Sequence, residues 1–223
     1  MFFGSARGIT GAWGGGHGDG NVPDFHPDRS GRLPIEVMAQ QNGWPLQPDL
    51  PYYEDGSPID LSGGPFAPQQ WRPNPPVVHG RAGYWSFWAL TVTARTRGNA
   101  WRPYALTFLQ AGGELPYVHV YPESWRASIT SVVPEVHLES SDFNDRYAVF
   151  AKDAQTVYGL LNPRAMQQLL QAPPLDEIWT AGQFVCIARV DPHHSAALAT
   201  HLDLLTGIAG GIPSSLYERD ISD

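Results

Sequence analysis

The sequence predicts an α+β fold: an antiparallel sheet of about six or seven strands with two or three helices packed on one face, preceded by a Gly/Pro-rich, poorly structured leader. The first observation is a series of short aromatic and β-branched runs, separated by turn residues, between residues 80 and 190. Most connections between these runs are too short for the crossovers that parallel strands need. Apolar residues at helical spacing follow Asp153 and Asp191.

The chain divides into four parts. We predict that residues 1–30 form a flexible leader, because they contain too few apolar side chains to offset the entropy of ordering. Residues 31–79 predict a short helix followed by a proline-rich connector without regular structure, which we place between Pro45 and Pro76. The α+β core domain follows at residues 80–215, and residues 216–223 form a tail.

The strands are predicted in order. Residues 83–94 and 104–112 form a hairpin, and three shorter strands are expected at residues 117–122, 136–140 and 146–151. Within residues 117–122, Val118 and Val120 share one face while Tyr117, His119 and Tyr121 share the other. We therefore expect His119 and His137 at outward or half-exposed positions.

Two helical regions complete the core domain. Asp153 is placed to cap a helix over residues 154–161, and Asn162-Pro163 restarts it over residues 163–172. A second hairpin is predicted from two strands, at residues 177–182 and 183–190. Asp191-Pro192 then opens the last helix, which Gly210-Gly211 ends.

The charge of the chain is acidic but uneven. The net charge of −8 argues against a protein that binds nucleic acid through bulk charge. Residues 66–128 nevertheless carry six arginines and only two carboxylates, a net charge of +4. The single cysteine, Cys186, excludes an intrachain disulfide, and no run of eighteen apolar residues or secretion signal is visible. These features lead us to expect a cytoplasmic protein without a transmembrane segment.

The stretch VHLESSDFNDRYAVFAKD, residues 136–153, concentrates acidic and amide groups next to Arg146. Such a cluster is typical either of a ligand or metal site or of the polar corner of a hairpin. We favour the corner, in which Phe143, Tyr147 and Val149 point into the core and Glu139 pairs with Arg146 or Arg164.

The same region carries a family resemblance. Leu138 and Glu139 lead into Phe143, Tyr147 and Val149, an acidic residue opens the next helix, and Leu161, Pro163 and Met166 form a step within it. This pattern resembles DUF3137, a family of uncharacterised bacterial proteins, and its actinobacterial relatives. The resemblance extends over residues 35–215 and is most specific over residues 137–170. It implies no catalytic residues, and the transmembrane helices found in many members have no counterpart in this sequence.

Arginine and tryptophan alternate in the first hairpin and give the best candidate binding surface. We predict a non-enzymatic binding or scaffold domain, without cofactor, whose surface comprises Arg81, Trp85, Trp88, Arg95, Arg97 and Trp101. The competing interpretation, which we favour, is that half of the aromatic residues in this region form the core of the hairpin, and the remaining tryptophans leave room for a partner. A protein partner or homo-oligomer is expected, and peripheral membrane association stays open.

The alternative function is a metal-dependent enzyme or hydrolase with a site at His119, His137 and Glu139, which could converge across neighbouring strands. A second histidine group, His193, His194 and His201, has the wrong spacing for a helical zinc pair. We expect these three to be solvated on the last helix.

Overall fold

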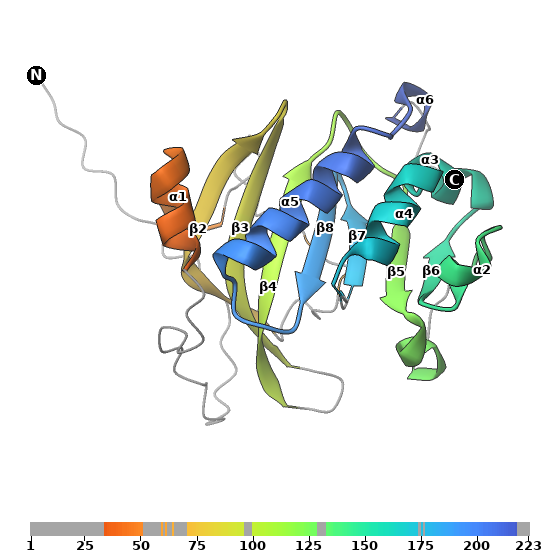
Figure 1. Cartoon of the computed structure of the whole chain (residues 1–223), viewed down its shortest axis with the longest axis horizontal. Helices are drawn as coiled ribbons and strands as arrows, with labels where there is room; N and C mark the ends of the chain where they lie inside the picture. Colours follow the sequence, from red (N-terminus) through yellow and green to blue (C-terminus); the bar gives the residue numbers. More distant parts are fainter. Residues whose placement is uncertain are drawn as a thin grey trace, which may run out of the picture.

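One antiparallel sheet of eight strands organises the described part of the chain, which comprises residues 34–50, 59, 61, 64, 71–95, 100–128, 133–173, 175 and 177–217 of this computed structural model. The order across the sheet is β1-β2-β3-β4-β8-β7-β5-β6 (Figure 1). The strands are β1 (Leu46–Gln47), β2 (Trp71–Ala82), β3 (Trp85–Arg95), β4 (Trp101–Gln110), β5 (Val118–Pro122), β6 (Tyr147–Ala151), β7 (Glu177–Ala181) and β8 (Phe184–Arg189).

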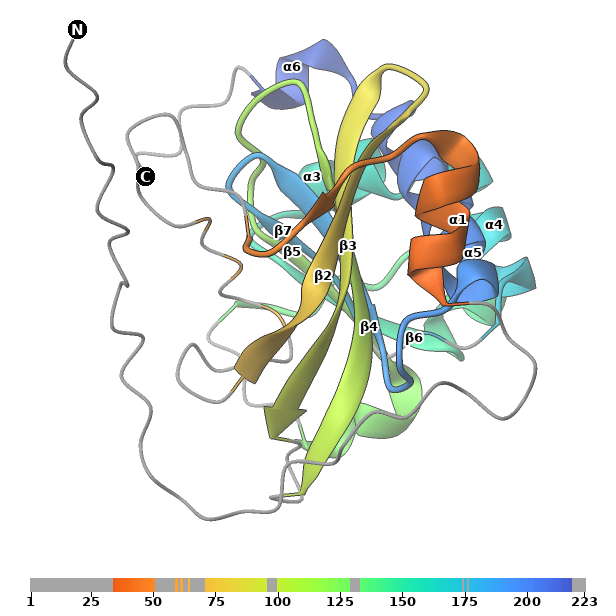
Figure 2. The same ribbon diagram turned by 90° about the vertical axis from the view of Figure 1, so that its left-hand side faces the viewer.

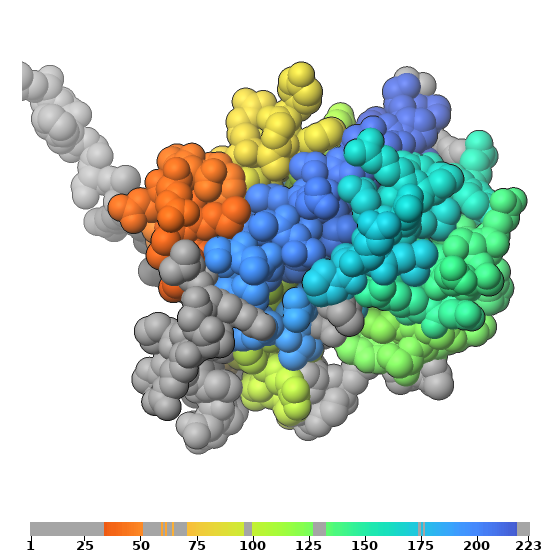
Figure 3. Space-filling model, in the orientation of Figure 1, coloured from red at the N-terminus to blue at the C-terminus, as the bar shows by residue number. Residues whose placement is uncertain are grey.

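Helices α1, α4 and α5 lie on one side of this sheet, which matches the prediction of two or three helices on one face (Figure 2). The longest, α5, crosses β4 and β8, with α1 on one flank and α4 on the other (Figures 1 and 3). The described helices are α1 (Ile35–Asn42), the 3-10 helix η1 (Glu123–Ser128), α2 (Ser141–Asn144), α3 (Ala154–Leu160), α4 (Pro163–Gln171), α5 (Ser195–Ala209) and α6 (Ser214–Tyr217).

The central strands are buried on both faces. In β3, Phe87 and Ala89 face the helices, whereas Trp88 and Leu90 belong to a separate apolar cluster on the opposite face. That second cluster includes Ile59 and Leu61, which lie before the sheet in sequence. The two-residue alternation of strands therefore divides the apolar side chains between two cores.

Two glycines with positive φ close hairpins, one that was not predicted, between β2 and β3, and one that was predicted, between β7 and β8. Gly83 (φ 62°) turns the chain between β2 and β3, and Gly182 (φ 53°) turns it between β7 and β8. Side chains other than glycine rarely adopt this left-handed conformation. The hairpin over residues 177–190 is confirmed, as is the pairing of β3 with β4.

The connector prediction is wrong at its C-terminal end. β2 begins at Trp71, so the predicted boundary between residues 79 and 80 falls inside a strand. Prolines are tolerated here because β2 is nearly an edge strand: β1 pairs only with Val77 and Val78, and the register with β3 is irregular between Asn74 and Val78. The predicted leader lies outside the described residues.

The predicted strand at residues 136–140 is also absent. Only a single bridge joins Glu135 to Phe150, and the Val136 N–H donates to the Val149 carbonyl. This segment covers the outer edge of β6 without becoming a strand. The extra strands relative to the prediction are thus β1 and β2, at the other end of the sheet.

The segment from Phe143 to Asn162 folds largely as predicted. Phe143, Tyr147 and Val149 are buried in the core on the helix side of the sheet. The Asp153 carboxylate accepts the Thr156 N–H and caps α3, and the Asn162 side chain accepts the Ala165 N–H and caps α4. Capping by these side chains satisfies helix N–H groups that have no partner within the helix.

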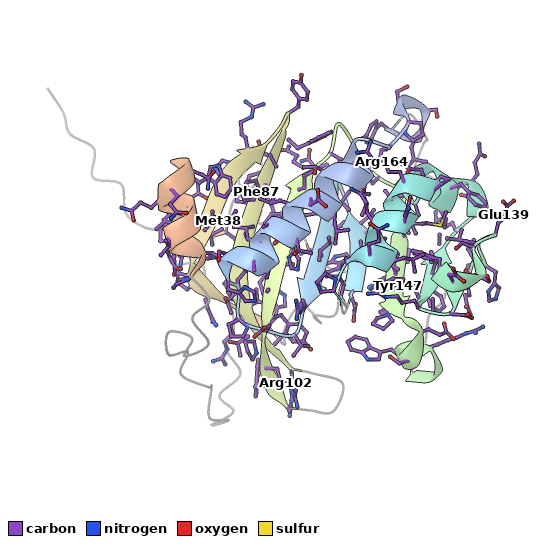
Figure 4. The ribbon with its side chains drawn as sticks, viewed as in Figure 1. Met38, Phe87, Arg102, Glu139, Tyr147 and Arg164 are labelled. Atoms are coloured by element: carbon purple, nitrogen blue, oxygen red, sulfur yellow. The ribbon has the colours of Figure 1, made fainter. Side chains whose placement is uncertain are left out.

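The role predicted for Glu139 is wrong. The Arg146 guanidinium donates to the carbonyl oxygens of Leu170 and Ala172, at the C-terminal end of α4. Glu139 is exposed and lies at the outer edge of the molecule, beside α2 (Figure 4). A cation at a helix C-terminus satisfies carbonyl groups that the helix leaves open and interacts favourably with the helix dipole.

We expect Phe143→Ala to lower the free energy of unfolding by about 3–5 kcal/mol, because it empties a fully buried site. Asp142→Ala, one residue away on an exposed position of α2, should cost about 1 kcal/mol or less. Urea denaturation of both variants measures the difference. Equal losses would place Phe143 outside the core and overturn the assigned faces.

Candidate functional site

A cluster of arginines and one tryptophan lies where β2, β3 and β4 extend beyond the helices. Arg95 stands directly opposite Trp101 in the β3–β4 ladder, and the Arg72 guanidinium lies 5.5 Å from the centre of the Trp101 ring. Arg102 follows on β4, at the lower end of the strand (Figure 4). We call Arg72, Arg95, Trp101 and Arg102 the basic end.

The other predicted surface residues lie elsewhere. Arg81 is at the opposite end of β2, where its guanidinium donates to the Tyr84 carbonyl. Trp85 packs partly against the helix-side core. Trp88 faces away from the helices and stacks between His79 and Phe108, with ring centroids 4.7 and 5.4 Å apart. Arg97 lies outside the described residues.

The predicted surface residues therefore do not form one patch. Arg95 and Trp101 lie at one end of the strands, Arg81 lies at the other, and Trp88 lies in the core. Strand alternation explains the result, because Trp85 and Trp88 are an odd number of residues apart and point to opposite faces. The sequence predicted which residue types gather on this hairpin. It did not predict how the strand length of β3 would separate them.

His119 is buried rather than half-exposed, and only 1 % of its surface is accessible. Its Nε2 lies 2.7 Å from the Glu177 carboxylate on β7. Its Nδ1 lies 2.8 Å from the Tyr121 hydroxyl and 3.2 Å from the Tyr117 hydroxyl. Since an ionised carboxylate only accepts, His119 donates from Nε2, and the single lone pair of Nδ1 accepts one tyrosine hydroxyl proton.

Tyr117 is held in its protonated form in this cluster. Burial and the nearby Glu177 charge raise its pKa, and the hydrogen bond with Tyr121 opposes them. The sheet face of His119 is covered, because Trp179 lies beside the His119 ring and the chain at Gly64 packs on Trp179. A methyl group placed on Gly64 would lie 2.4 Å from the Trp179 ring.

The three residues of the metal-site hypothesis do not converge. His119 bonds to Glu177, whereas His137 is largely exposed and has Glu135 as its nearest carboxylate, at 3.8 Å. Glu139 is exposed at the edge of the molecule. Among the residues that the structure describes, no group of three or more His, Cys, Asp or Glu side chains could hold a metal ion.

The polar stretch that includes Asn144 forms a structured corner. The Asn144 side chain accepts the Leu138 N–H and donates to the Leu138 carbonyl, closing the loop before α2. Nearby, Arg126 pairs with both Glu123 and Glu135. A polar pocket of about 430 Å³ opens here and is lined by Glu123, Arg126, Glu135, Val136, His137, Asn144, Asp145 and Tyr147.

The histidines of the last helix are also buried, contrary to the prediction that they are solvated. The Thr107 hydroxyl lies 2.8 Å from His193 Nε2 and 2.9 Å from His201 Nδ1. Burial lowers the pKa of His193 to about 3 and that of His201 well below its ordinary value. A signal was present in the sequence: His201 follows Leu198 by three residues and precedes Leu205 by four, which is the spacing of a buried helix stripe.

Cys186 is fully buried in β8, and burial raises the pKa of its thiol well above the ordinary value. The thiol therefore packs as a small apolar group instead of acting as a nucleophile.

Comparison with known proteins identifies a family segment and one shared fold. Residues 117–174 match the model of DUF3137, a protein family of unknown function, which confirms the resemblance over β5 to α4. No curated protein matches the chain. The crystal structure of the mycobacterial trehalose monomycolate transport factor A, TtfA, is similar with a TM-score of 0.51 and 10% identity, over 80% of this chain and 93% of that one.

The similarity to TtfA concerns the fold alone, because the identity is so low. It supports the α+β architecture with an antiparallel sheet. Among the described helices, none is long and apolar enough to cross a bilayer.

Glu177→Ala should lower the free energy of unfolding by about 3–5 kcal/mol, because it leaves the buried His119 Nε2 without its acceptor. Glu177→Gln retains an amide oxygen at this position and should cost distinctly less. Glu139→Ala, an exposed carboxylate, serves as the matched control and should change stability by about 0.5 kcal/mol or less. Chemical denaturation at pH 7 tests the order; a Glu177→Ala loss equal to that of the control would contradict it.

Proposed function

We propose that this chain, whose residues 117–174 match DUF3137, is a non-enzymatic binding domain that holds an acidic segment of a protein partner at its basic end. The observation that carries the proposal is the arrangement of Arg72 over the Trp101 ring, with Arg95 opposite the same tryptophan. Arginine and tryptophan together are typical of interface residues that contribute most to binding.

Charge distribution supports an acidic partner. The chain has a net charge of −8, yet Arg72, Arg95 and Arg102 all lie at the same end of three adjacent strands, Arg72 and Arg95 on the face that carries Trp101 and Arg102 on the opposite face. Concentrating positive charge on an otherwise acidic protein steers an anionic segment to one place and repels it elsewhere. The aromatic surface of Trp101 offers apolar contact at the same position.

Two features support binding over catalysis. The buried polar clusters at His119 and at Thr107 satisfy groups within the sheet, and each is nearly inaccessible to a substrate. The hydrolase alternative required His119, His137 and Glu139 to converge, and His137 instead lies beside Glu135. The basic end combines exposed charge with a half-buried aromatic ring and does not depend on either cluster.

The test is the binding of a fluorescein-labelled decaglutamate peptide, followed by fluorescence anisotropy. We expect Arg72→Glu combined with Arg95→Glu to weaken binding at least about tenfold. The expected wild-type affinity falls as salt concentration rises, since exposed charges are screened.

The control variant combines Arg81→Glu with Arg164→Glu, two exposed arginines far from the basic end, on β2 and α4. It changes the net charge by the same amount and should alter affinity less than about twofold. Equal weakening by both variants would indicate a response to net charge, and no binding by the wild-type protein would rule out an acidic peptide as ligand. Thermal melts of each variant verify folding.

A further inference from the structure

Three histidines surround the first turns of α5, and each has a role that requires a neutral ring. We propose that Thr107, His193, His194 and His201 form an acid-sensitive latch, which holds the start of α5 on the sheet at neutral pH and releases it in mild acid before the rest of the domain unfolds. We call these four residues the histidine latch. The inference does not depend on the proposed binding function.

The latch joins three parts of the chain. Thr107 belongs to β4, His193 to the loop after β8, and His201 to α5, and the one hydroxyl lies within 3 Å of both rings. The His193 backbone N–H also donates to the Thr91 hydroxyl on β3. The loop and the helix are thereby tied to the two strands beneath them.

The hydroxyl of Thr107 carries a single proton. At neutral pH it donates to one imidazole and accepts from the other. If both rings were protonated, two N–H groups would point at one oxygen and its own proton would lose its acceptor. The remaining ring nitrogens, His193 Nδ1 and His201 Nε2, are buried and have no hydrogen-bond partner among the described residues. Backbone groups of His194 and Leu106 favour a charged His193 ring, but burial outweighs them and lowers its pKa.

His194 acts at the helix N-terminus itself. Its Nδ1 accepts the Ala197 N–H and caps α5, at 3.2 Å. Protonation of Nδ1 would turn this acceptor into a donor and place positive charge at the positive end of the helix dipole. The caps of α2, α3 and α4 are Ser140, Asp153 and Asn162, which remain acceptors in mild acid. Among these four capped helices, only α5 has a cap that mild acid can remove.

The charges around His193 and His201 disfavour an imidazolium. Arg189 on β8 adds positive charge near His201, and the two buried rings lie only 5.4 Å apart. The exception is the carboxylate of Asp191, which lies 3.7 Å from His194 Nε2 and favours a positive charge on that ring. The other elements that pack on α5 contribute few ionisable groups: α1 carries Glu36, α4 carries Arg164, and α5 itself carries Asp203.

The direction of the pH effect follows from the lowered pKa values. The folded state binds fewer protons at His193 and His201 than the open state does, so stability is full above about pH 6.5 and declines as pH falls below it. For His193 the decline continues to about pH 3. Each histidine shifts the opening equilibrium by about tenfold for each pH unit in this range.

Hydrogen exchange followed by mass spectrometry on the full chain, at pH 7.5 and 5.5 with correction for intrinsic rates, tests the proposal. Protection of residues 190–202 should fall at least about tenfold at pH 5.5, while β7 and β8 stay protected. A uniform loss across the domain, or no loss, would overturn the latch.

The deciding variant is His193→Gln combined with His194→Asn and His201→Asn. Gln places an amide near the former Nε2 and Asn places one near the former Nδ1, so hydrogen-bonding groups remain and titration is removed. Its exchange at residues 190–202 should be independent of pH. The control His137→Asn, at an exposed position beside Glu135, should respond to acid as the wild-type protein does.

If the triple variant does not fold, His194→Asn alone provides the measurement, because Asn is a good helix cap. It should reduce the acid-induced loss of protection at the start of α5. An unchanged acid response in this variant, or an unchanged response in a folded triple variant, would show that the histidines do not control the opening.

Discussion

Burial of the central strands on both faces is the constraint on which the rest of the structure depends. β4, β7 and β8 are covered by helices on one side and by a second apolar cluster on the other. Every polar side chain in these strands must then find a partner inside the protein, because an unpaired buried group costs about 1–3 kcal/mol. The pairing of Glu177 with His119, and of Thr107 with two histidines, follows from this requirement.

The same constraint limits where a partner can bind. Trp88 lies in a ring stack inside the protein, and His119 is enclosed, so neither can contact an outside molecule directly. Exposed charge is left at the strand ends, where the sheet extends beyond α5 and the arginines of β2 and β3 share the face of Trp101. The family segment, residues 117–174, lies at the opposite edge of the sheet from β2 and supplies β5, β6 and the helices that cover them.

Buried histidines also link stability to the proton concentration. A structural hydrogen bond made by a neutral imidazole is as good as one made by an amide at neutral pH, but only the imidazole changes its hydrogen-bonding capacity near pH 6. The three histidines near the start of α5 place this sensitivity in one element. Arg189, on the neighbouring strand β8, strengthens it by disfavouring further positive charge.

Local sequence signals determined much of the fold. Asp153 and Asn162 cap helices, glycines turn the hairpins, and Phe143, Tyr147 and Val149 face the core, since capping, turn chemistry and side-chain alternation act between residues a few positions apart. The strand β2 was missed because its prolines contradict a strand locally and are tolerated only at an edge, which is a property of the sheet. Likewise, the partner of His119 lies 58 residues away and that of His201 lies 94 residues away. Which strands become neighbours is decided by the packing of the whole sheet, so only the tertiary structure could bring these groups together and bury them.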